Sequence, residues 1–217
     1  MTLIDPSIEA RRFAPESIAL AVRTIGACPV ACHRPDNRIL CGIGVLHVSP
    51  CQNGYRFSAG AVCRAEEDTT TRLLDWLEPQ LAGYDAIISW SNWGSVAHRL
   101  RAIADLERHP HIISAATDTA CRWRDMPRGH TWHLRQAPAA HLPCLCPRGT
   151  RIGECDRATP TCLLPDPTLT AASLIREAIA GWQTWAQLVS NFAAPADPAS
   201  AALRALEQWR NEQRPAV

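Results

Sequence analysis

The sequence predicts an α/β fold, and three observations lead to this prediction. Residues 17–27 and 38–49 are apolar stretches of strand length, and the Asn53-Gly54 pair that follows is typical of a hairpin turn into a third strand. From residue 66 the apolar positions recur at helical spacing. A fourth apolar strand at 85–90 is followed at once by another amphipathic helix, which is the element order of an α/β domain.

The first three strands are expected to form an antiparallel meander, because they are consecutive and the second and third share a hairpin turn. The fourth strand is expected beside the first. Ahead of the meander, Asp5 as a cap and Pro6 at the first helical position favour a short helix.

Four helices are expected after the meander. Their apolar stripes are Leu73, Leu74, Leu77 and Leu81 in the first, Val96, Leu100, Ile103 and Leu106 in the second, Ile175, Ile179, Trp182, Ala186 and Val189 in the third, and Leu203, Leu206 and Trp209 in the last. Pro79 is expected to kink or end the first helix, and Arg108–His111 to end the second. Asp166-Pro167 and Asp197-Pro198 predict where the last two helices begin.

The chain is expected to form one domain over residues 1–192, followed by a C-terminal helix over 193–217. Its 217 residues are enough to bury a substantial core. Between residues 109 and 165, Pro, Gly, His, Cys and Arg crowd together, which predicts a long irregular insertion. Loops of that length are uncommon unless they have a function.

Composition favours a soluble, cytoplasmic protein. No apolar run reaches the length of about 18 residues that a membrane span needs, and residues 1–12 lack the apolar core of a signal peptide. Most of the ten cysteines are expected to be reduced. The net charge is only +1, but all 22 basic residues are arginine, which binds phosphate and stacks on bases better than lysine does. Codon bias alone is the simpler explanation of this arginine usage.

Two short stretches follow from the predicted positions of the first and fourth strands. "LAVRT" (20–24) lies at the end of the first strand, and "NWGSVA" (92–97) follows the fourth. These positions and the element order over residues 17–192 resemble the DEDD-type 3′-to-5′ exonucleases of the polymerase-B-like proofreading branch. That family carries Asp-x-Glu-Thr at the first place, Asn-Gly-x-x-Phe-Asp at the second, and an acid in the last core helix, where "SLIRE" offers Glu177.

The resemblance implies a ribonuclease H-like mixed sheet, with an antiparallel three-strand meander and a parallel strand, flanked by helices. It also implies a site of four carboxylates that hold two divalent cations about 4 Å apart. The matched positions here are Ala21, Arg23, Ala97 and Glu177, with Asn92 at the same corner. One carboxylate cannot hold two hard cations, and the fixed charge of Arg23 would repel them.

We therefore expect a catalytically degenerate exonuclease-like protein, without a cofactor, that binds nucleic acid or a protein partner and does not cleave. Two alternatives stay open beside an unrelated α/β protein. The first is an active metal-dependent 3′-to-5′ exonuclease that uses Mg²⁺ or Mn²⁺ on displaced acids, for which Asp85, Asp105, Asp118 and Asp166 are candidates. The second is a structural subunit with a zinc-stapled loop.

Single-stranded DNA or RNA is the expected nucleic-acid partner. Arg23 would contact a backbone phosphate where the family places metals, with Asn92 at the same mouth. Arginines interleaved with exposed aromatics can hold single strands by charge neutralisation and stacking. The residues that could extend this surface are Arg99, Arg122, Arg124, Arg128, Trp123 and Trp132, and packing is an equal alternative for the two tryptophans.

The insertion also contains a possible zinc site. Structural zinc takes four nitrogen or sulfur ligands, usually as two close pairs. The candidates are His130, His133, Cys144, Cys146, Cys155 and Cys162, with His141 nearby. Their spacing departs from the usual Cys-x-x-Cys pattern, so loop and packing roles remain the simpler interpretation. His98, one residue after Ala97, is a conceivable base and more simply a surface side chain.

Overall fold

The computed structural model describes residues 13–26, 38–64, 69–90, 95–118, 122–125, 170–190 and 197–213. The helix expected from Asp5 lies outside these residues. So do the expected cap Asp166 and residues 119–121 and 126–165 of the predicted insertion.

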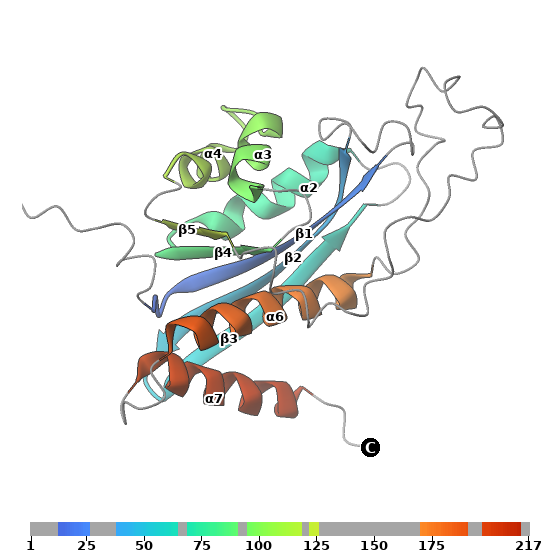
Figure 1. The fold of residues 1–217 in the computed structure, drawn as a ribbon. Helices are drawn as coiled ribbons and strands as arrows, with labels where there is room; N and C mark the ends of the chain where they lie inside the picture. Colours follow the sequence, from blue (N-terminus) through green and yellow to red (C-terminus); the bar gives the residue numbers. More distant parts are fainter. Residues whose placement is uncertain are drawn as a thin grey trace, which may run out of the picture.

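A five-stranded mixed sheet forms the centre of the fold (Figure 1). Its strands are β1 (Ser17–Gly26), β2 (Arg38–Cys51), β3 (Gly54–Cys63), β4 (Ala86–Trp90) and β5 (Trp123–Asp125), in the order β3-β2-β1-β4-β5. β2 is antiparallel to β1 and β3, whereas β4 is parallel to β1 and β5 is parallel to β4. The predicted meander and the place of the fourth strand are confirmed, and β5 is a strand that the sequence pattern did not predict.

The turn between β2 and β3 follows from one glycine. Gly54 has a φ of +130°, in the region that side chains disfavour, and Cys51 pairs with Gly54 across the turn. Gln52 and Asn53 therefore form a two-residue connection, so the predicted hairpin is present and its turn lies one residue before the Asn53-Gly54 pair.

The first helix after the meander agrees with its predicted stripe. α2 (Thr70–Leu77) continues directly into the short 3₁₀ helix η3 (Glu78–Leu81), which contains Pro79. The four predicted leucines are buried. Pro79 therefore changes the helix type at the position where a kink or an end was expected.

The next helical region differs from the prediction. α3 (Val96–Ile103) ends before Leu106, which is 71% exposed, and a separate helix α4 (Pro110–Thr117) follows. The Asp105 carboxylate accepts hydrogen bonds from the Glu107 and Arg108 amides at 2.9 Å, which makes a local turn in place of further helix. Pro110 is then the first residue of α4. Residues 104–109 thus connect the two helices, so the prediction that Arg108–His111 end the second helix is wrong, and residues 110–117 of the predicted insertion are helical.

The last two helices pack together on one face of the sheet. α6 (Ala171–Val189) is capped by Thr170, which forms a capping box with Ser173, so its start lies C-terminal to the predicted Asp166-Pro167. α7 (Pro198–Glu212) begins as predicted, with Asp197 accepting from the Ser200 amide at 2.8 Å. None of the described helices is both long and apolar enough to cross a membrane.

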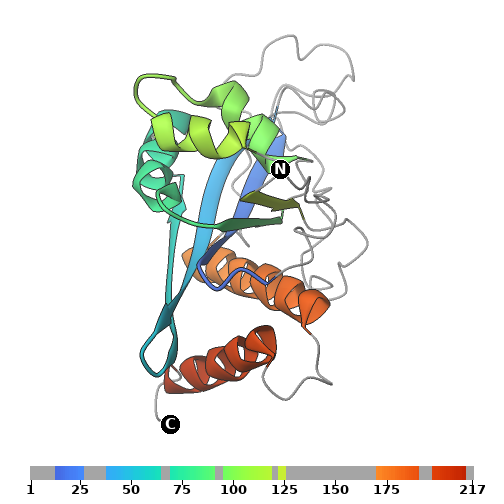
Figure 2. The ribbon, with the colours of Figure 1, turned by 90° about the vertical axis from the view of Figure 1, so that its left-hand side faces the viewer.

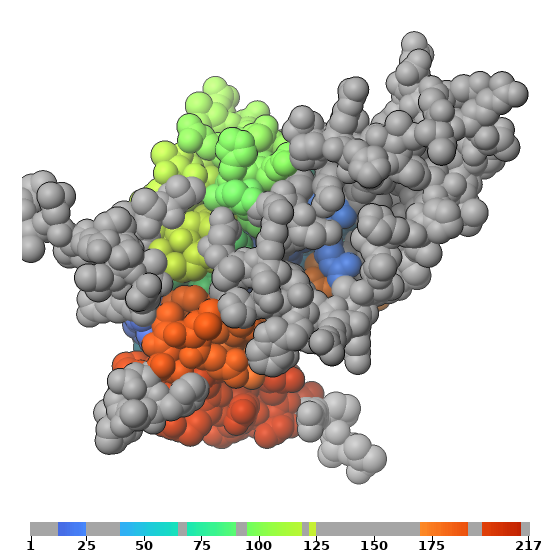
Figure 3. Space-filling model, viewed as in Figure 1, coloured from blue at the N-terminus to red at the C-terminus, as the bar shows by residue number. Residues whose placement is uncertain are grey.

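Helices cover both faces of the sheet (Figures 1 and 2), and an apolar cluster lies on each face. Ile18, Leu20 and Val22 of β1 face the cluster under α2, α3 and α4, while Ala19 and Ala21 face the cluster under α6 and α7. The space-filling view shows both helical layers at the surface, with α3 and α4 in green and α6 and α7 in orange and red (Figure 3). β1 therefore contributes to both halves of the core.

Candidate functional site

Arg23 lies near the end of β1, on the face that α6 covers. The side chains of a strand alternate between faces, so Arg23 follows Ala19 and Ala21. The pairing of β1 with β2 shifts register between Arg23 and Thr24. Arg23 is thus the last residue before this shift, and the alternation of the strand directs its side chain toward α6.

Arg23 forms an ion pair with Glu177 of α6. The Arg23 Nε donates to Glu177 Oε2 at 3.1 Å, and the Arg23 Nη2 donates to Glu177 Oε1. The Arg23 side chain is 20% exposed and the Glu177 side chain 9%. A guanidinium that meets both oxygens of a carboxylate is the strongest form of such a pair. Two of the four positions matched to the family's acids thus contact each other, although 154 residues separate them.

Small residues let α6 lie directly on the sheet beside this pair. Ala21 of β1 is paired with Gly44 of β2, and Ala21 is fully buried. A Cβ at Gly44 would lie 2.5 Å from the backbone oxygen of Leu174, which leaves no space for one. Glu177 follows Leu174 by three residues and therefore lies on the same face of α6. The helix backbone and the ion pair together fill the region near Ala21 and Arg23.

The matched position after the fourth strand, Ala97, is not brought to this pair. Ala97 is buried in α3 and belongs to the apolar cluster on the opposite face of the sheet. Asn92 lies outside the described residues. Of the four matched positions, Ala21, Arg23 and Glu177 therefore share one face and Ala97 packs against the other.

The predicted nucleic-acid residues have varied surroundings. Trp123 is 6% exposed, and its Nε1 donates to the Ser89 hydroxyl at 2.8 Å, so its ring packs in the core. Arg122 donates to the backbone oxygens of Tyr84 (3.0 Å) and Leu81 (3.5 Å). Arg124 donates to the backbone oxygen of Trp123 at 3.1 Å.

Arg99 is part-exposed on α3, and His98 beside it is exposed, with its amide donating to the Ser95 hydroxyl. Arg128 and Trp132 lie outside the described residues.

The possible zinc ligands all fall outside the described residues. Among the residues that are described, no three His, Cys, Asp or Glu side chains form a group that could hold a metal ion. Cys51 and Cys63 are free thiols, and burial raises the pKa of the Cys63 thiol.

The displaced acids are spread over different elements. Asp85 immediately precedes β4, at the opposite end of that strand from Asn92. Asp105 makes the turn after α3, and Asp118 is the C-cap of α4. Asp166 lies outside the described residues. The described positions give no sign of the compact acidic site that the active-nuclease alternative requires.

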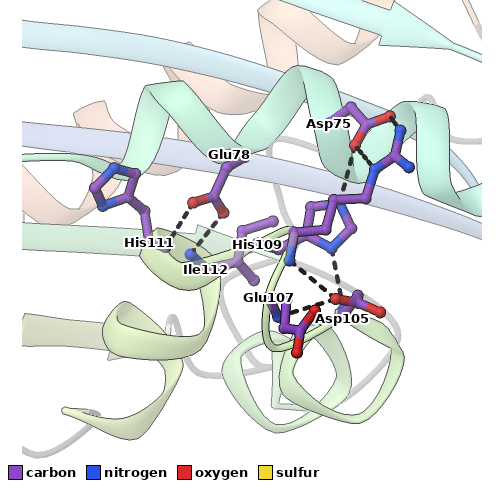
Figure 4. A network of polar contacts seen from close by, with 8 residues as sticks. Asp75, Glu78, Asp105, Glu107, His109, His111 and Ile112 are labelled. Atoms are coloured by element: carbon purple, nitrogen blue, oxygen red, sulfur yellow. Dashed lines mark hydrogen bonds and ion pairs between the residues drawn. The ribbon is translucent and has the colours of Figure 1, made fainter.

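A polar network ties α2 and η3 to the turn before α4 (Figure 4). The Asp75 carboxylate accepts two hydrogen bonds from Arg108, at 2.6 and 2.7 Å, and one from the Nε2 of His109 at 3.1 Å. His109 is 1% exposed, and its Nδ1 accepts the Asp105 amide hydrogen at 3.0 Å, which leaves Nε2 as the donor.

The hydrogen bond from Arg108, with a smaller one from His109, lowers the pKa of Asp75 from 3.8 to about 2. The Glu78 carboxylate accepts from the amides of His111 and Ile112, at 2.6 and 3.0 Å, so an acid of η3 satisfies the first turn of α4. In the sequence, Pro110 is the signal that a helix begins here, because proline is frequent at the first position of a helix.

Comparisons of the chain with protein families, with curated protein sequences and with solved structures found no match. Function is therefore inferred from the side chains that the fold brings together, above all Arg23 and Glu177.

Proposed function

We propose that the chain is a ribonuclease H-like domain of the DEDD exonuclease type that has lost its metal chemistry, and that it binds nucleic acid or a protein partner without cleaving it. The mixed sheet supports the proposal, since an antiparallel meander with a parallel strand beside β1 is the arrangement that the resemblance implies. The contact of the last core helix with the end of β1 also supports it.

The ion pair between Arg23 and Glu177 is the observation on which the proposal depends. Mg²⁺ and Mn²⁺ need several oxygen ligands, mostly charged ones, and a two-metal site needs carboxylates from more than one element. Glu177 is the one acid at the four matched positions, and both of its oxygens already contact Arg23. A guanidinium within bonding distance of that carboxylate also opposes any cation there. Arg23 therefore contacts the carboxylate oxygens that would bind metal ions in an active relative.

The absence of cleavage is tested with the full chain and end-labelled single-stranded DNA and RNA, incubated with Mg²⁺ or Mn²⁺ and with EDTA as the control. We expect no shortening of either strand. The Glu177→Gln variant separates this chain from a contaminating nuclease, because a contaminant is unaffected by it. Shortening that requires the metal and disappears in Glu177→Gln would contradict the proposal.

Binding is tested by fluorescence anisotropy of the same labelled strands over a range of salt concentrations. If nucleic acid is the partner, affinity falls as salt rises, because bound arginines displace counterions. Arg99→Ala on α3 is then expected to reduce the salt slope by about 1, whereas Arg204→Ala on the opposite helical layer leaves it unchanged. If the affinity is undetectable or independent of salt, nucleic acid is excluded as the partner and a protein partner is the remaining proposal.

A further inference from the structure

β3 is a long edge strand of ten residues with no irregularity in its pairing. It pairs with β2 over all ten residues from Gly54 to Cys63 without a shift in register. It stands at the end of the strand order, and no described strand lies on its outer side (Figure 2). Exposed edges of this kind are sites where another strand can add.

The hydrogen bonds to β2 determine which backbone groups face outward. Arg64 donates its amide hydrogen to Cys41 at 2.7 Å and so continues the register of the ladder. Because bonded and non-bonded pairs alternate in an antiparallel ladder, the even-numbered residues of β3 bond to β2. The amide and carbonyl groups that point outward are those of Tyr55, Phe57, Ala59, Ala61 and Cys63. No turn, loop or cap hydrogen bond among the described residues uses these groups.

The usual protections of an edge are missing from β3. Natural edges carry lysine, proline, a bulge or an inward-pointing charge that blocks further pairing. β3 reads GYRFSAGAVC, with Arg56 as its one charged residue and no proline. Its backbone is therefore able to accept a further strand along the whole length.

Side-chain size along β3 favours a second copy of the same strand. Large residues occupy the first half, Tyr55 to Phe57, and small ones the second half, Ala59 to Cys63. A two-fold axis at Ala59 would place Tyr55 opposite Cys63 and Phe57 opposite Ala61, so large residues meet small ones. The same register uses all five outward-facing residues of each copy, which gives about ten backbone hydrogen bonds.

Charge and helix placement agree with this register. It puts Arg56 opposite Val62, and the two copies of Arg56 lie about 20 Å apart along the strands, beyond strong repulsion. Tyr55 donates to the backbone oxygen of Pro198, which locates the start of α7 near the hairpin end of β3. An antiparallel pair therefore keeps the starts of the two α7 helices at opposite ends of the junction.

We propose that the chain forms a symmetric dimer in which the outer edge of β3 pairs antiparallel with β3 of a second copy and joins the two sheets into one. A self-complementary patch of this kind is what a two-fold interface requires. The proposal is independent of the proposed function, because it involves neither Arg23 nor Glu177.

The first test is the mass of the full chain in solution, measured by light scattering over a range of concentrations. We expect a dimer that dissociates on dilution. Ala59→Pro removes an outward amide at the two-fold axis and leaves the ladder to β2 intact, because proline is tolerated where its nitrogen faces away from the partner strand. This variant is expected to be a monomer with an unchanged circular dichroism spectrum. A wild-type chain that stays monomeric, or a folded Ala59→Pro variant that stays dimeric, would overturn the proposal.

The second test determines the register and does not depend on Ala59→Pro folding. The chain contains no lysine, so one introduced lysine provides a unique side-chain amine. Ser58 and Arg56 are both exposed on the same face of β3. In the proposed register the two copies of residue 58 lie about 8 Å apart, and those of residue 56 about 20 Å apart. A short amine-to-amine cross-linker should join Ser58→Lys dimers far more efficiently than Arg56→Lys dimers, with the wild type as background. Equal cross-linking of the two variants would rule out this pairing.

Discussion

Arg23 and Glu177 carry opposite charges and form an ion pair that is largely removed from water. Each would be costly alone, since an unpartnered charge that is mostly removed from water loses its solvation. Together they satisfy each other, and the pair joins the end of β1 to α6. Removing one partner is therefore expected to cost more than removing both.

We expect Glu177→Met or Arg23→Met to destabilise the protein by about 1–3 kcal/mol, because each leaves a part-buried charged group without its partner. The double variant Arg23→Met, Glu177→Met should lose less than the sum of the two single losses, because neither charge is then left unpaired. Urea unfolding of the four proteins measures this coupling, with Arg101→Ala on the exposed side of α3 as the control. Additive losses would indicate that the pair contributes little to the fold.

We expect Asp75 to make the free energy of unfolding depend on pH in the acidic range. Hydrogen bonds from Arg108 and His109 lower its pKa in the folded state from 3.8 to about 2, so the unfolded chain takes up this proton first as the pH falls. The stabilisation from Asp75 is therefore complete above about pH 4 and is lost as the pH approaches 2.

The melting temperatures of the wild type and Asp75→Asn should accordingly converge over that window. A difference between the two proteins that stayed constant down to about pH 2 would contradict the lowered pKa of Asp75.

At the scale of elements, the decisive contact is that of α6 with β2. Gly44 leaves room for the backbone of Leu174, and that close approach brings Glu177 within reach of Arg23. The α2–α4 layer is held differently, since Asp75 and Glu78 bind side chains and amides of the turn into α4. The layer of α6 and α7 is thus positioned by the lack of a side chain at Gly44, and the layer of α2 and α4 by polar contacts.

Gly44→Ala is expected to destabilise the protein by about 1–3 kcal/mol, because its Cβ would overlap the Leu174 carbonyl and displace α6. Gly60→Ala is the matched control on the neighbouring strand. The nearest atom to a Cβ there is 3.5 Å away, on the Trp76 ring, which is an ordinary contact.

The control variant should show little loss, or a gain of up to about 1 kcal/mol from reduced freedom of the unfolded chain. Chemical denaturation of both variants measures the difference. Equal effects at the two glycines would show that α6 can move away from the sheet without cost.

At the scale of the whole molecule, one mixed sheet supplies both the proposed function and the proposed assembly. The end of β1 holds the Arg23–Glu177 ion pair on which the proposed function depends. The far edge, β3, offers unpaired backbone for a second copy. The two features lie on different strands, because β2 separates β1 from β3 in the sheet, so binding of a partner and dimer formation need not compete.

Local sequence was enough to determine those parts of the fold that depend on neighbouring residues. Apolar stretches of strand length predicted the strands of the meander, the Asn53-Gly54 pair the hairpin, and Asp197 the start of α7. Prediction from local sequence failed where two local signals compete. The three-residue spacing that links Leu106 to Ile103 suggested continued helix, but the turn made by Asp105 and the helix start at Pro110 prevailed.

Only the tertiary structure decided which distant residues meet. The sequence indicated that Arg23 stands where an acid was expected, but not that Glu177, 154 residues later, would neutralise it. It likewise left Trp123 undecided between stacking and packing, until the hydrogen bond to Ser89 and the burial of its ring decided for packing. The reason is physical: periodicity and capping act within a few residues, whereas an ion pair or a buried ring depends on how the sheet and its helices are brought together.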